Sequence, residues 1–398
     1  MKPARNRFLS TAALAALLVP LSVPVAQEIN AQGEFMVFIG TYTRLQEGRG
    51  APSKSQGIYA YRFQPATGKM TSIGLAFETV NPSFVAIHPN HRFLYSVNEV
   101  SEYEGQPAGS ISAFAIDSKT GKLKLLNVVS SRGTQPCHLI LDKTGKWLLV
   151  ANYGSGSTAV FPVKRNGSLG EASSFVQHSG SSVNLRRQQG PHSHCIVLSP
   201  DNRFALVSDL GLDKILIYRF DAAKGTITPN DPLFGKIPAG NGPRHLAFHR
   251  NGQWLYVISE MQPAVTTFAY DPARGSLEEL QTISAFPEGY QGRGSGAEIQ
   301  VHPNGKFLYC SIRGLNNIGV FAIDGQKGTV APVEHVPTQG NTPRHFTLDP
   351  TGAFLFVEHQ TSDSIVMFHV EQNTGKLTPT GNKLEVPMPV CVTFLAVK

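Results

Sequence analysis

Arginine, histidine and glutamate residues recur at fixed places in this sequence, and together they suit acid–base chemistry on a small anion. Arg244-His245 and Arg344-His345 are charged pairs at positions that hold apolar residues elsewhere in the chain. Guanidinium groups bind carboxylate or phosphate through paired hydrogen bonds, while histidine and glutamate can exchange protons. The candidates for catalysis or substrate binding are His138, His192, His194, Arg244, His245, Glu260, Glu298, Arg313, Arg344 and His345.

Structural roles are open for several polar residues. Arg244 and Arg344 could simply pair with a neighbouring glutamate. His192 and His194 form a His-x-His pattern that also occurs in metal sites, but no third ligand stands at a fixed spacing. We therefore predict no metal and no other cofactor. Three further histidines stand at turns where other repeats hold Asp or Ser, and we interpret them as structural caps: His88, His249 and His302.

The elements that must carry these residues follow a repeat of about fifty residues, which occurs seven times. Each repeat has a first strand with alternating apolar residues, a turn that ends in Gly, a second strand, a third strand and a Gly hairpin. First strands are expected to begin at Pro82, Pro136, Ser193, Pro243, Gly296, Pro343 and Pro389. The hairpin glycines give the same count: Gly68, Gly121, Gly167, Gly225, Gly275, Gly328 and Gly375.

Four antiparallel strands in each of seven repeats, without a helical pattern, predict an all-β fold, the seven-bladed β-propeller. Residues 36–42 match a second strand, and residues 389–394 match a first strand. We expect these terminal strands to share one blade and close the ring, which leaves no open seam. One propeller domain would then span residues 36–398, after a short lead at 27–35.

The chain begins with a segment typical of an export signal. Residues 1–26 hold three basic residues near the start and then an uncharged stretch rich in Ala and Leu. A retained membrane anchor is the alternative, although Pro20 and Pro24 disfavour it. Removing the segment lowers the formal net charge from +7 to +4, a balance that does not indicate nucleic acid as a partner. We expect an exported monomer, periplasmic or secreted, with no membrane contact after cleavage.

Four cysteines in an exported chain raise the question of disulfides. Cys137, Cys195, Cys310 and Cys391 all fall in expected strands of different repeats, where bridging geometry would be fortuitous. We predict buried free thiols.

In a propeller the first strands line the channel, and two junctions of every blade open on one face: the entry to the first strand and the exit from the second. Asn98-Glu99 and Ser259-Glu260 end equivalent second strands. We interpret Glu260 as the better acid or base, because we expect it to lie next to the blade that carries Arg244. Three long connections open on the same face: 44–56, 178–190 and 286–295. Three aromatic residues are interpreted as packing at the rim: Tyr42, Phe84 and Tyr153.

Several phrases of the sequence resemble the seven-bladed β-propeller lactonase family. They are Gly190-Pro191-His192-Ser193-His194, Gly242-Pro243-Arg244-His245, Ser259-Glu260, and Ala297-Glu298-Ile299 followed by 302–309. This family includes the propeller-type 6-phosphogluconolactonase and the fungal 3-carboxy-cis,cis-muconate cyclase, and the similarity covers residues 36–398. One departure is Ser259, which stands where the family commonly has Asn and could alter substrate contacts.

The resemblance implies metal-free chemistry on a lactone. The site proposed for the cyclase branch falls by phrase on His194 or His192, Arg244, Glu260 and Arg313. The hypothesis assigns proton transfer to His194 or Glu260, and charge neutralisation to Arg244 and Arg313.

We therefore expect a lactonase that acts on a small anionic lactone or carboxylate, of the sugar-acid type and related to 6-phosphogluconolactone. Export favours an unphosphorylated substrate, because the phosphorylated sugar lactone is a cytoplasmic metabolite. Two alternatives are a muconate-cycloisomerase-like lyase acting on an unsaturated dicarboxylate and a non-catalytic propeller that binds a ligand or a protein.

Overall fold

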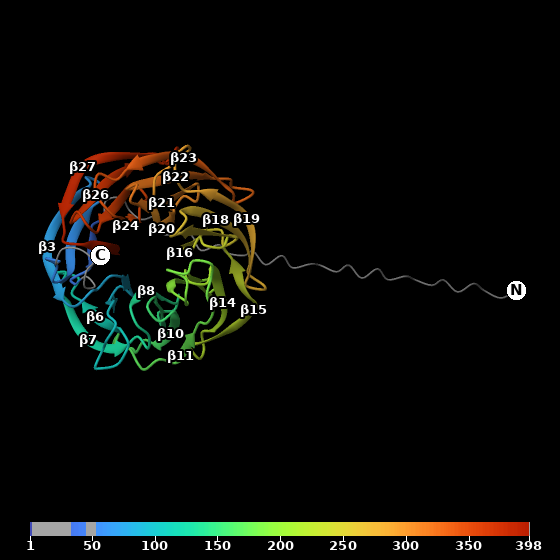
Figure 1. The fold of residues 1–398 in the computed structure, drawn as a ribbon. Helices are drawn as coiled ribbons and strands as arrows, with labels where there is room; N and C mark the ends of the chain where they lie inside the picture. Colours follow the sequence, from blue (N-terminus) through green and yellow to red (C-terminus); the bar gives the residue numbers. More distant parts are fainter. Residues whose placement is uncertain (2–32, 45–52, 398) are drawn as a thin grey trace.

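Seven four-stranded antiparallel sheets form a ring in the computed structural model, which describes Met1, residues 33–44 and residues 53–397 (Figure 1). This arrangement confirms the predicted seven-bladed β-propeller. Apart from Met1, the expected export signal at 1–26 lies outside the described residues. In the described ranges there is no helix with the length and hydrophobicity needed to span a bilayer.

Each blade runs from an inner strand to an outer strand. Blade 1 comprises β28 (Pro389–Ala396), β1 (Phe35–Thr41), β2 (Gly57–Gln64) and β3 (Lys69–Glu78). Blade 2 comprises β4 (Val85–Ile87), β5 (Phe93–Asn98), β6 (Ser110–Ile116) and β7 (Leu123–Ser130). Blade 3 comprises β8 (Pro136–Leu141), β9 (Trp147–Asn152), β10 (Ser157–Pro162) and β11 (Ser174–Gln177). Blade 4 comprises β12 (Ser193–Leu198), β13 (Phe204–Asp209), β14 (Lys214–Asp221) and β15 (Thr226–Lys236).

The remaining three blades have the same order. Blade 5 comprises β16 (Pro243–Phe248), β17 (Trp254–Ser259), β18 (Ala264–Asp271) and β19 (Ser276–Ser284). Blade 6 comprises β20 (Ser295–Val301), β21 (Phe307–Arg313), β22 (Asn317–Ile323) and β23 (Val330–Pro337). Blade 7 comprises β24 (Pro343–Leu348), β25 (Phe354–His359), β26 (Ser364–Val370) and β27 (Leu377–Glu385).

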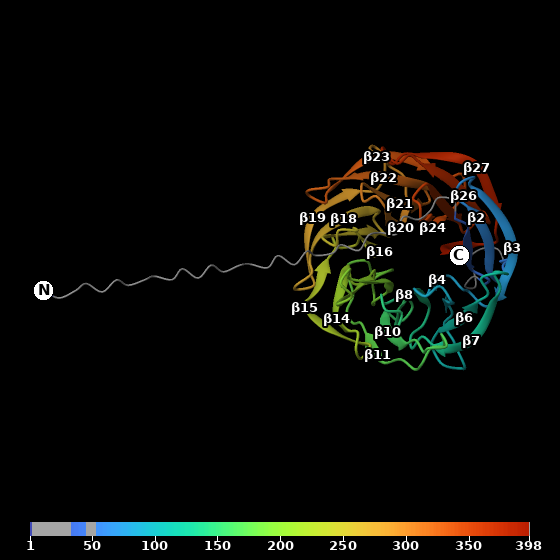
Figure 2. The ribbon, with the colours of Figure 1, turned by 180° about the vertical axis from the view of Figure 1, so that it is seen from behind.

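The two ends of the chain meet in blade 1, as the sequence predicts. The last strand, β28, pairs antiparallel with β1, so that Phe38 is opposite Thr393. Both views of the ring show the blue strands of blade 1 beside the red strands of blade 7 (Figures 1 and 2). The expected inner-strand starts hold to within one residue except in blade 2, where β4 begins at Val85 and not at Pro82. There the carbonyl of Pro82 accepts a hydrogen bond from Thr41 N in blade 1 (3.1 Å), outside the ladder of its own blade.

The apolar core lies between neighbouring blades. One buried cluster, for example, combines Tyr309 of blade 6 with Val357 of blade 7. Tyrosine hydroxyls add hydrogen bonds across the same interfaces, as in Tyr256 OH, which donates to the carbonyl of Gly328 in the next blade at 2.9 Å. Tyr95 and Tyr309 make the same contact, each with the carbonyl of a hairpin glycine in the next blade. A side chain cannot replace the hydrogen of Gly328, because φ is +75° and a Cβ would lie 2.5 Å from Trp254.

The histidines interpreted as caps have that role. Nδ1 of His88 accepts a hydrogen bond from Asn90 N at 3.0 Å, and Nε2 bonds to the carbonyl of Gly145 in the next blade at 2.8 Å. His249 and His302 make the corresponding pairs of bonds. The four cysteines are buried free thiols, as predicted.

Candidate active site

A β-bulge near the start of the inner strands turns consecutive residues into the channel. In β16 the residues on either side of Arg244 pair with consecutive residues of β17, so Arg244 is the extra residue. The same bulge makes His194 the extra residue of β12 and Arg344 the extra residue of β24. A bulge breaks the alternation of side chains and re-aims the extra one. As a result Arg244 and its neighbour His245 line the same small space.

A cavity of about 900 Å³ opens on the face where these bulges lie, and we call it the large cavity. The candidates that line it are His192, His194, Glu260, Arg313 and Arg344. Arg186 and Arg187 of the 178–190 connection line it as well. The large cavity is therefore rich in cationic groups, as a site for a small anion requires.

Three guanidinium groups converge on the carboxylate of Glu260, which follows β17. Oε2 lies 3.2 Å from Nε of Arg244 and 3.0 Å from Nη2 of Arg313. Oε1 accepts a hydrogen bond from Nη2 of Arg187 at 2.7 Å. Burial would raise the pKa of Glu260, but the charges of Arg313, Arg244 and Arg187 lower it well below the ordinary range of a carboxyl group. Glu260 is therefore ionised and acts as the hub of the cationic cluster.

Arg187 was not among the residues selected from the sequence. It reaches Glu260 from the 178–190 connection, and its Nη2 also donates to Tyr153 OH at 3.1 Å. The signal available in the sequence was the length of that connection together with its two consecutive arginines. Without the tertiary structure nothing indicates that this loop folds back over blade 5.

The structure separates the two histidines between which the sequence left a choice. His194 is buried, and its Nε2 lies 3.9 Å from Oε2 of Glu260. His192 stacks on the ring of Tyr153 with centroids 4.7 Å apart, and its Nδ1 lies 3.0 Å from the carbonyl of Tyr153. Burial and the nearby charge of Arg244 lower the pKa of His194 well below its ordinary value. His194 is thus a neutral ring beside the cationic cluster.

A second layer of polar residues lies below the bulges. Nδ1 of His245 is 2.8 Å from Oε2 of Glu298, and Nε2 of His345 is 3.2 Å from the same oxygen. Nδ1 of His345 bonds to Glu358 at 2.9 Å. Burial lowers the pKa of His245 to about 4. For Glu298, burial acts to raise the pKa, but His245 and His345 lower it to about 2.

These second-layer residues stand apart from the large cavity. His138, His245, Glu298 and His345 were candidates for substrate binding, and none of them lines it. The ring of His138 packs on Phe84 at 4.2 Å. Glu358, which the sequence reasoning did not select, completes the layer. In the part of the chain that the structure describes, no group of three or more His, Cys, Asp or Glu side chains is placed to hold a metal ion.

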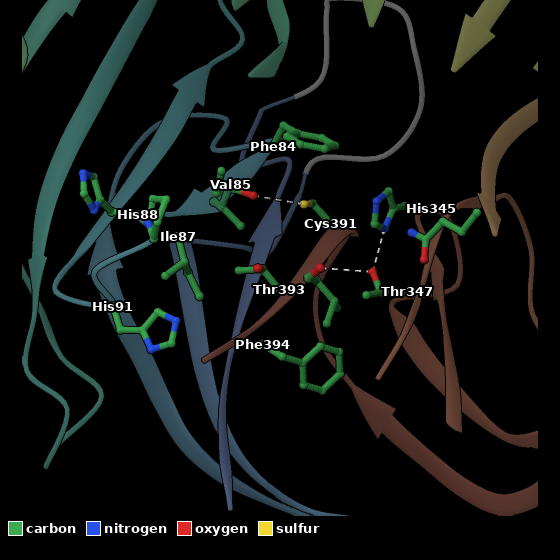
Figure 3. Close-up of a pocket in the computed structure, with 14 residues that line it drawn as sticks. Phe84, Val85, Ile87, His88, His91, His345, Thr347, Cys391, Thr393 and Phe394 are labelled. Carbon is green, nitrogen blue, oxygen red and sulfur yellow. Dashed lines mark hydrogen bonds between the residues drawn. The ribbon is translucent and has the colours of Figure 1, made fainter. Parts of the chain in front are cut away.

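Two smaller spaces continue the large cavity towards the other face. A space of about 10 Å³, which we call the small space, is lined by both layers, including His194, Arg244, His245 and His345. A lower cavity of about 420 Å³ lies at the far ends of the inner strands and shares His345 and Phe84 with the small space. Figure 3 shows Phe84 and His345 at one end of the lining of the lower cavity and Phe394 at the other.

A second carboxyl group, Glu99, lines both the large cavity and the small space. It follows β5 and occupies the position in blade 2 that Glu260 occupies in blade 5. Oε2 of Glu99 accepts hydrogen bonds from Tyr42 OH at 2.7 Å and from Ser83 Oγ at 2.5 Å. Nη2 of Arg344 donates to the same Tyr42 hydroxyl at 3.0 Å. Tyr42, interpreted from the sequence as rim packing, thus links Arg344 to Glu99.

Comparisons with known proteins agree with the propeller fold. The family model described as "Lactonase, 7-bladed beta-propeller" matches residues 36–394. The chain is 34% identical over 362 residues to the 6-phosphogluconolactonase of Bacillus subtilis, which covers 91% of this chain and 99% of that protein. It is 34% identical over 355 residues to the 6-phosphogluconolactonase of Formosa agariphila, covering 88% of this chain and 96% of that protein.

A solved structure gives the same result. The periplasmic gluconolactonase of Pseudomonas aeruginosa superposes with a TM-score of 0.84 at 32% sequence identity, over 92% of this chain and 100% of that one. The match of the family model covers nearly all of the described residues. This chain therefore belongs to the seven-bladed β-propeller lactonase family.

Proposed function

We propose that this protein is a lactonase that hydrolyses a small anionic lactone to its hydroxy acid. The observation that carries the proposal is the convergence of Arg244, Arg313 and Arg187 on Glu260 at the wall of the large cavity. Ester hydrolysis passes through an intermediate with negative charge on the former carbonyl oxygen, and preorganised cationic donors stabilise that charge. The relatives named 6-phosphogluconolactonase and gluconolactonase support the same reaction class.

The surroundings of each residue suggest its role. Arg244 and Arg313 hold the acid group of the substrate or the developing oxyanion, and Glu260 keeps their guanidinium planes oriented. Because Glu260 is tied to three cations, it is a weak proton acceptor. His194 supplies a neutral hydrogen-bonding group at the same wall, and its lowered pKa makes it a weak base.

The substrate we propose is a sugar-acid lactone without a phosphate group, whose negative charge is a free carboxylate. Two arguments support this choice: the expected export signal and the periplasmic location in the name of the Pseudomonas aeruginosa relative. We further propose that the mature protein is a monomer, periplasmic or secreted, and that the reaction requires no metal ion.

The test is to purify the mature chain and to follow acid release from a panel of phosphorylated and unphosphorylated sugar lactones. We expect Arg244→Ala and Glu260→Gln to lose most of the activity on the best substrate. Full activity in both variants would refute the assignment of the site. Product analysis with an unsaturated dicarboxylate provides the second arm, since ring closure in place of hydrolysis would identify a lyase.

A further inference from the structure

The ring places two carboxyl groups on opposite sides of the large cavity. Glu99 follows the second strand of blade 2, and Glu260 follows the second strand of blade 5. These blades are three places apart in a ring of seven, which is the largest separation such a ring allows. Both carboxyl groups line the large cavity. A substrate bound in the large cavity would therefore lie between the carboxyl groups of Glu99 and Glu260.

The two carboxyl groups have opposite surroundings. Glu260 faces three guanidinium groups, whereas the only hydrogen bonds from described residues to the carboxyl group of Glu99 come from the hydroxyls of Tyr42 and Ser83. Both end on Oε2, and within the described ranges no side chain or backbone group donates to Oε1. Burial raises the pKa of Glu99 above that of a free glutamate, although Arg344 opposes the shift. A pair of carboxyl groups with pKa values displaced in opposite directions is the pattern in which one exchanges protons and the other stays charged.

The small space lies directly beside Glu99. Its volume of about 10 Å³ is close to that of one water-sized probe. Polar groups of the kind that hold a water molecule surround it. The titratable and charged residues that line this space together with Glu99 come from five different blades: Tyr42, Cys137, His194, Arg244, His245, Arg344 and His345.

We propose that Glu99 is the general base of the lactonase, activating a water molecule in the small space; this inference rests on the proposed function. The Glu99 carboxylate takes a proton from the water, and the water oxygen bonds to the acyl carbon of the lactone. The electron pair of the carbonyl moves onto its oxygen, towards Arg244. When the intermediate collapses, the bond between the acyl carbon and the ring oxygen breaks, and the ring oxygen takes the proton back from Glu99. The product is the hydroxy acid, which ionises in solvent.

The test compares wild type with Glu99→Gln on the lactone that wild type turns over fastest. The amide preserves the hydrogen bonds to Tyr42 and Ser83 but cannot accept the proton. We expect kcat to fall by about 10²- to 10⁴-fold, the range for loss of a general base, while KM changes little. The acidic limb of the kcat/KM profile, in which activity falls as Glu99 becomes protonated, should disappear. Glu102→Gln, which changes an exposed glutamate three positions further on, is the matched control and should retain wild-type kinetics.

A second variant keeps the test decisive if Glu99→Gln does not fold. Glu99→Asp keeps a carboxylate at a greater distance from the small space, so we expect a lower kcat with the acidic limb retained. If Glu99→Gln folds and its kcat and acidic limb equal those of wild type, Glu99 is not the base, and the proposed function still stands. If Glu99→Gln does not fold, a kcat of Glu99→Asp equal to that of wild type overturns the inference. If wild type hydrolyses no lactone, both proposals fail together.

Discussion

Glu260→Gln is the perturbation whose consequence the structure defines best. The substitution keeps the shape of the side chain and removes the only negative charge that contacts Arg244, Arg313 and Arg187 within the described residues. Arg244 suffers most, because its side chain is 3% exposed and would be left as an uncompensated buried charge. The side chain of Arg187 is 44% exposed, so water can solvate its guanidinium group when the ion pair with Glu260 is lost.

The expected loss of stability follows from that burial. Breaking a buried ion pair by removing one partner costs about 3–5 kcal/mol, and the exposed pair with Arg187 adds less than about 1 kcal/mol. With an unfolding entropy of about 2.1 cal/mol/K per residue, a propeller of about 360 residues should melt roughly 4–8 °C lower. Glu278→Gln, on the exposed outer strand β19, is the control and should melt at the wild-type temperature.

Thermal unfolding with and without inorganic phosphate is the assay. An anion that binds only the folded state raises the melting temperature, and the freed guanidinium groups should bind phosphate more tightly than the neutralised cluster does. Phosphate should therefore raise the melting temperature of Glu260→Gln by more than it raises that of wild type. The view of Glu260 as the hub of a buried cationic cluster would be refuted if the variant had the wild-type melting temperature and phosphate raised that temperature no more than it does in wild type.

Three other predictions test the ring, the second layer and the chemistry. Tyr256→Phe removes the donor to the carbonyl of Gly328 and should lower the free energy of unfolding in urea by about 1 kcal/mol; an unchanged midpoint would contradict that role. His245 and Glu298 have pKa values of about 4 and about 2 in the folded protein, against ordinary values of 6.5 and 4.5. At these two groups the unfolded state therefore binds more protons than the folded state, so their contribution to the melting temperature should be lost as the pH drops from about 6.5 towards 2. Lactonase activity should survive dialysis against EDTA, whereas a loss that Zn²⁺ or Ca²⁺ restores would show that the reaction requires a metal.

The fold was readable from the sequence because each blade repeats the same local rules. Alternating apolar residues such as Leu246 and Phe248 identify an inner strand, and the hairpin glycines count the blades. The match of residues 389–394 to a first strand predicted the closure that β28 and β1 form. These signals are local, so they survive in a single sequence.

The candidate site was readable only in part. Departures from the apolar pattern pointed to Arg244, Glu260 and Arg313, which the structure brings together. The same criterion selected Glu298 and His345, which belong to the buried second layer. Period-two alternation cannot distinguish the two layers, because the bulge that separates them depends on pairing with the neighbouring strand.

The sequence by itself determined the number of blades, the closure of the ring and the types of residue that gather at one face. Only the tertiary structure decided which of those residues meet. Arg187 reaches Glu260 from a loop 73 residues away in the chain, and Tyr42 and Arg344 meet across 302 residues. Charge and hydrogen bonding depend on distance in space, and in a ring that distance is set by the order of blades and the bulges of their inner strands. The opposite surroundings of Glu99 and Glu260, at equivalent positions of two blades, follow from that geometry.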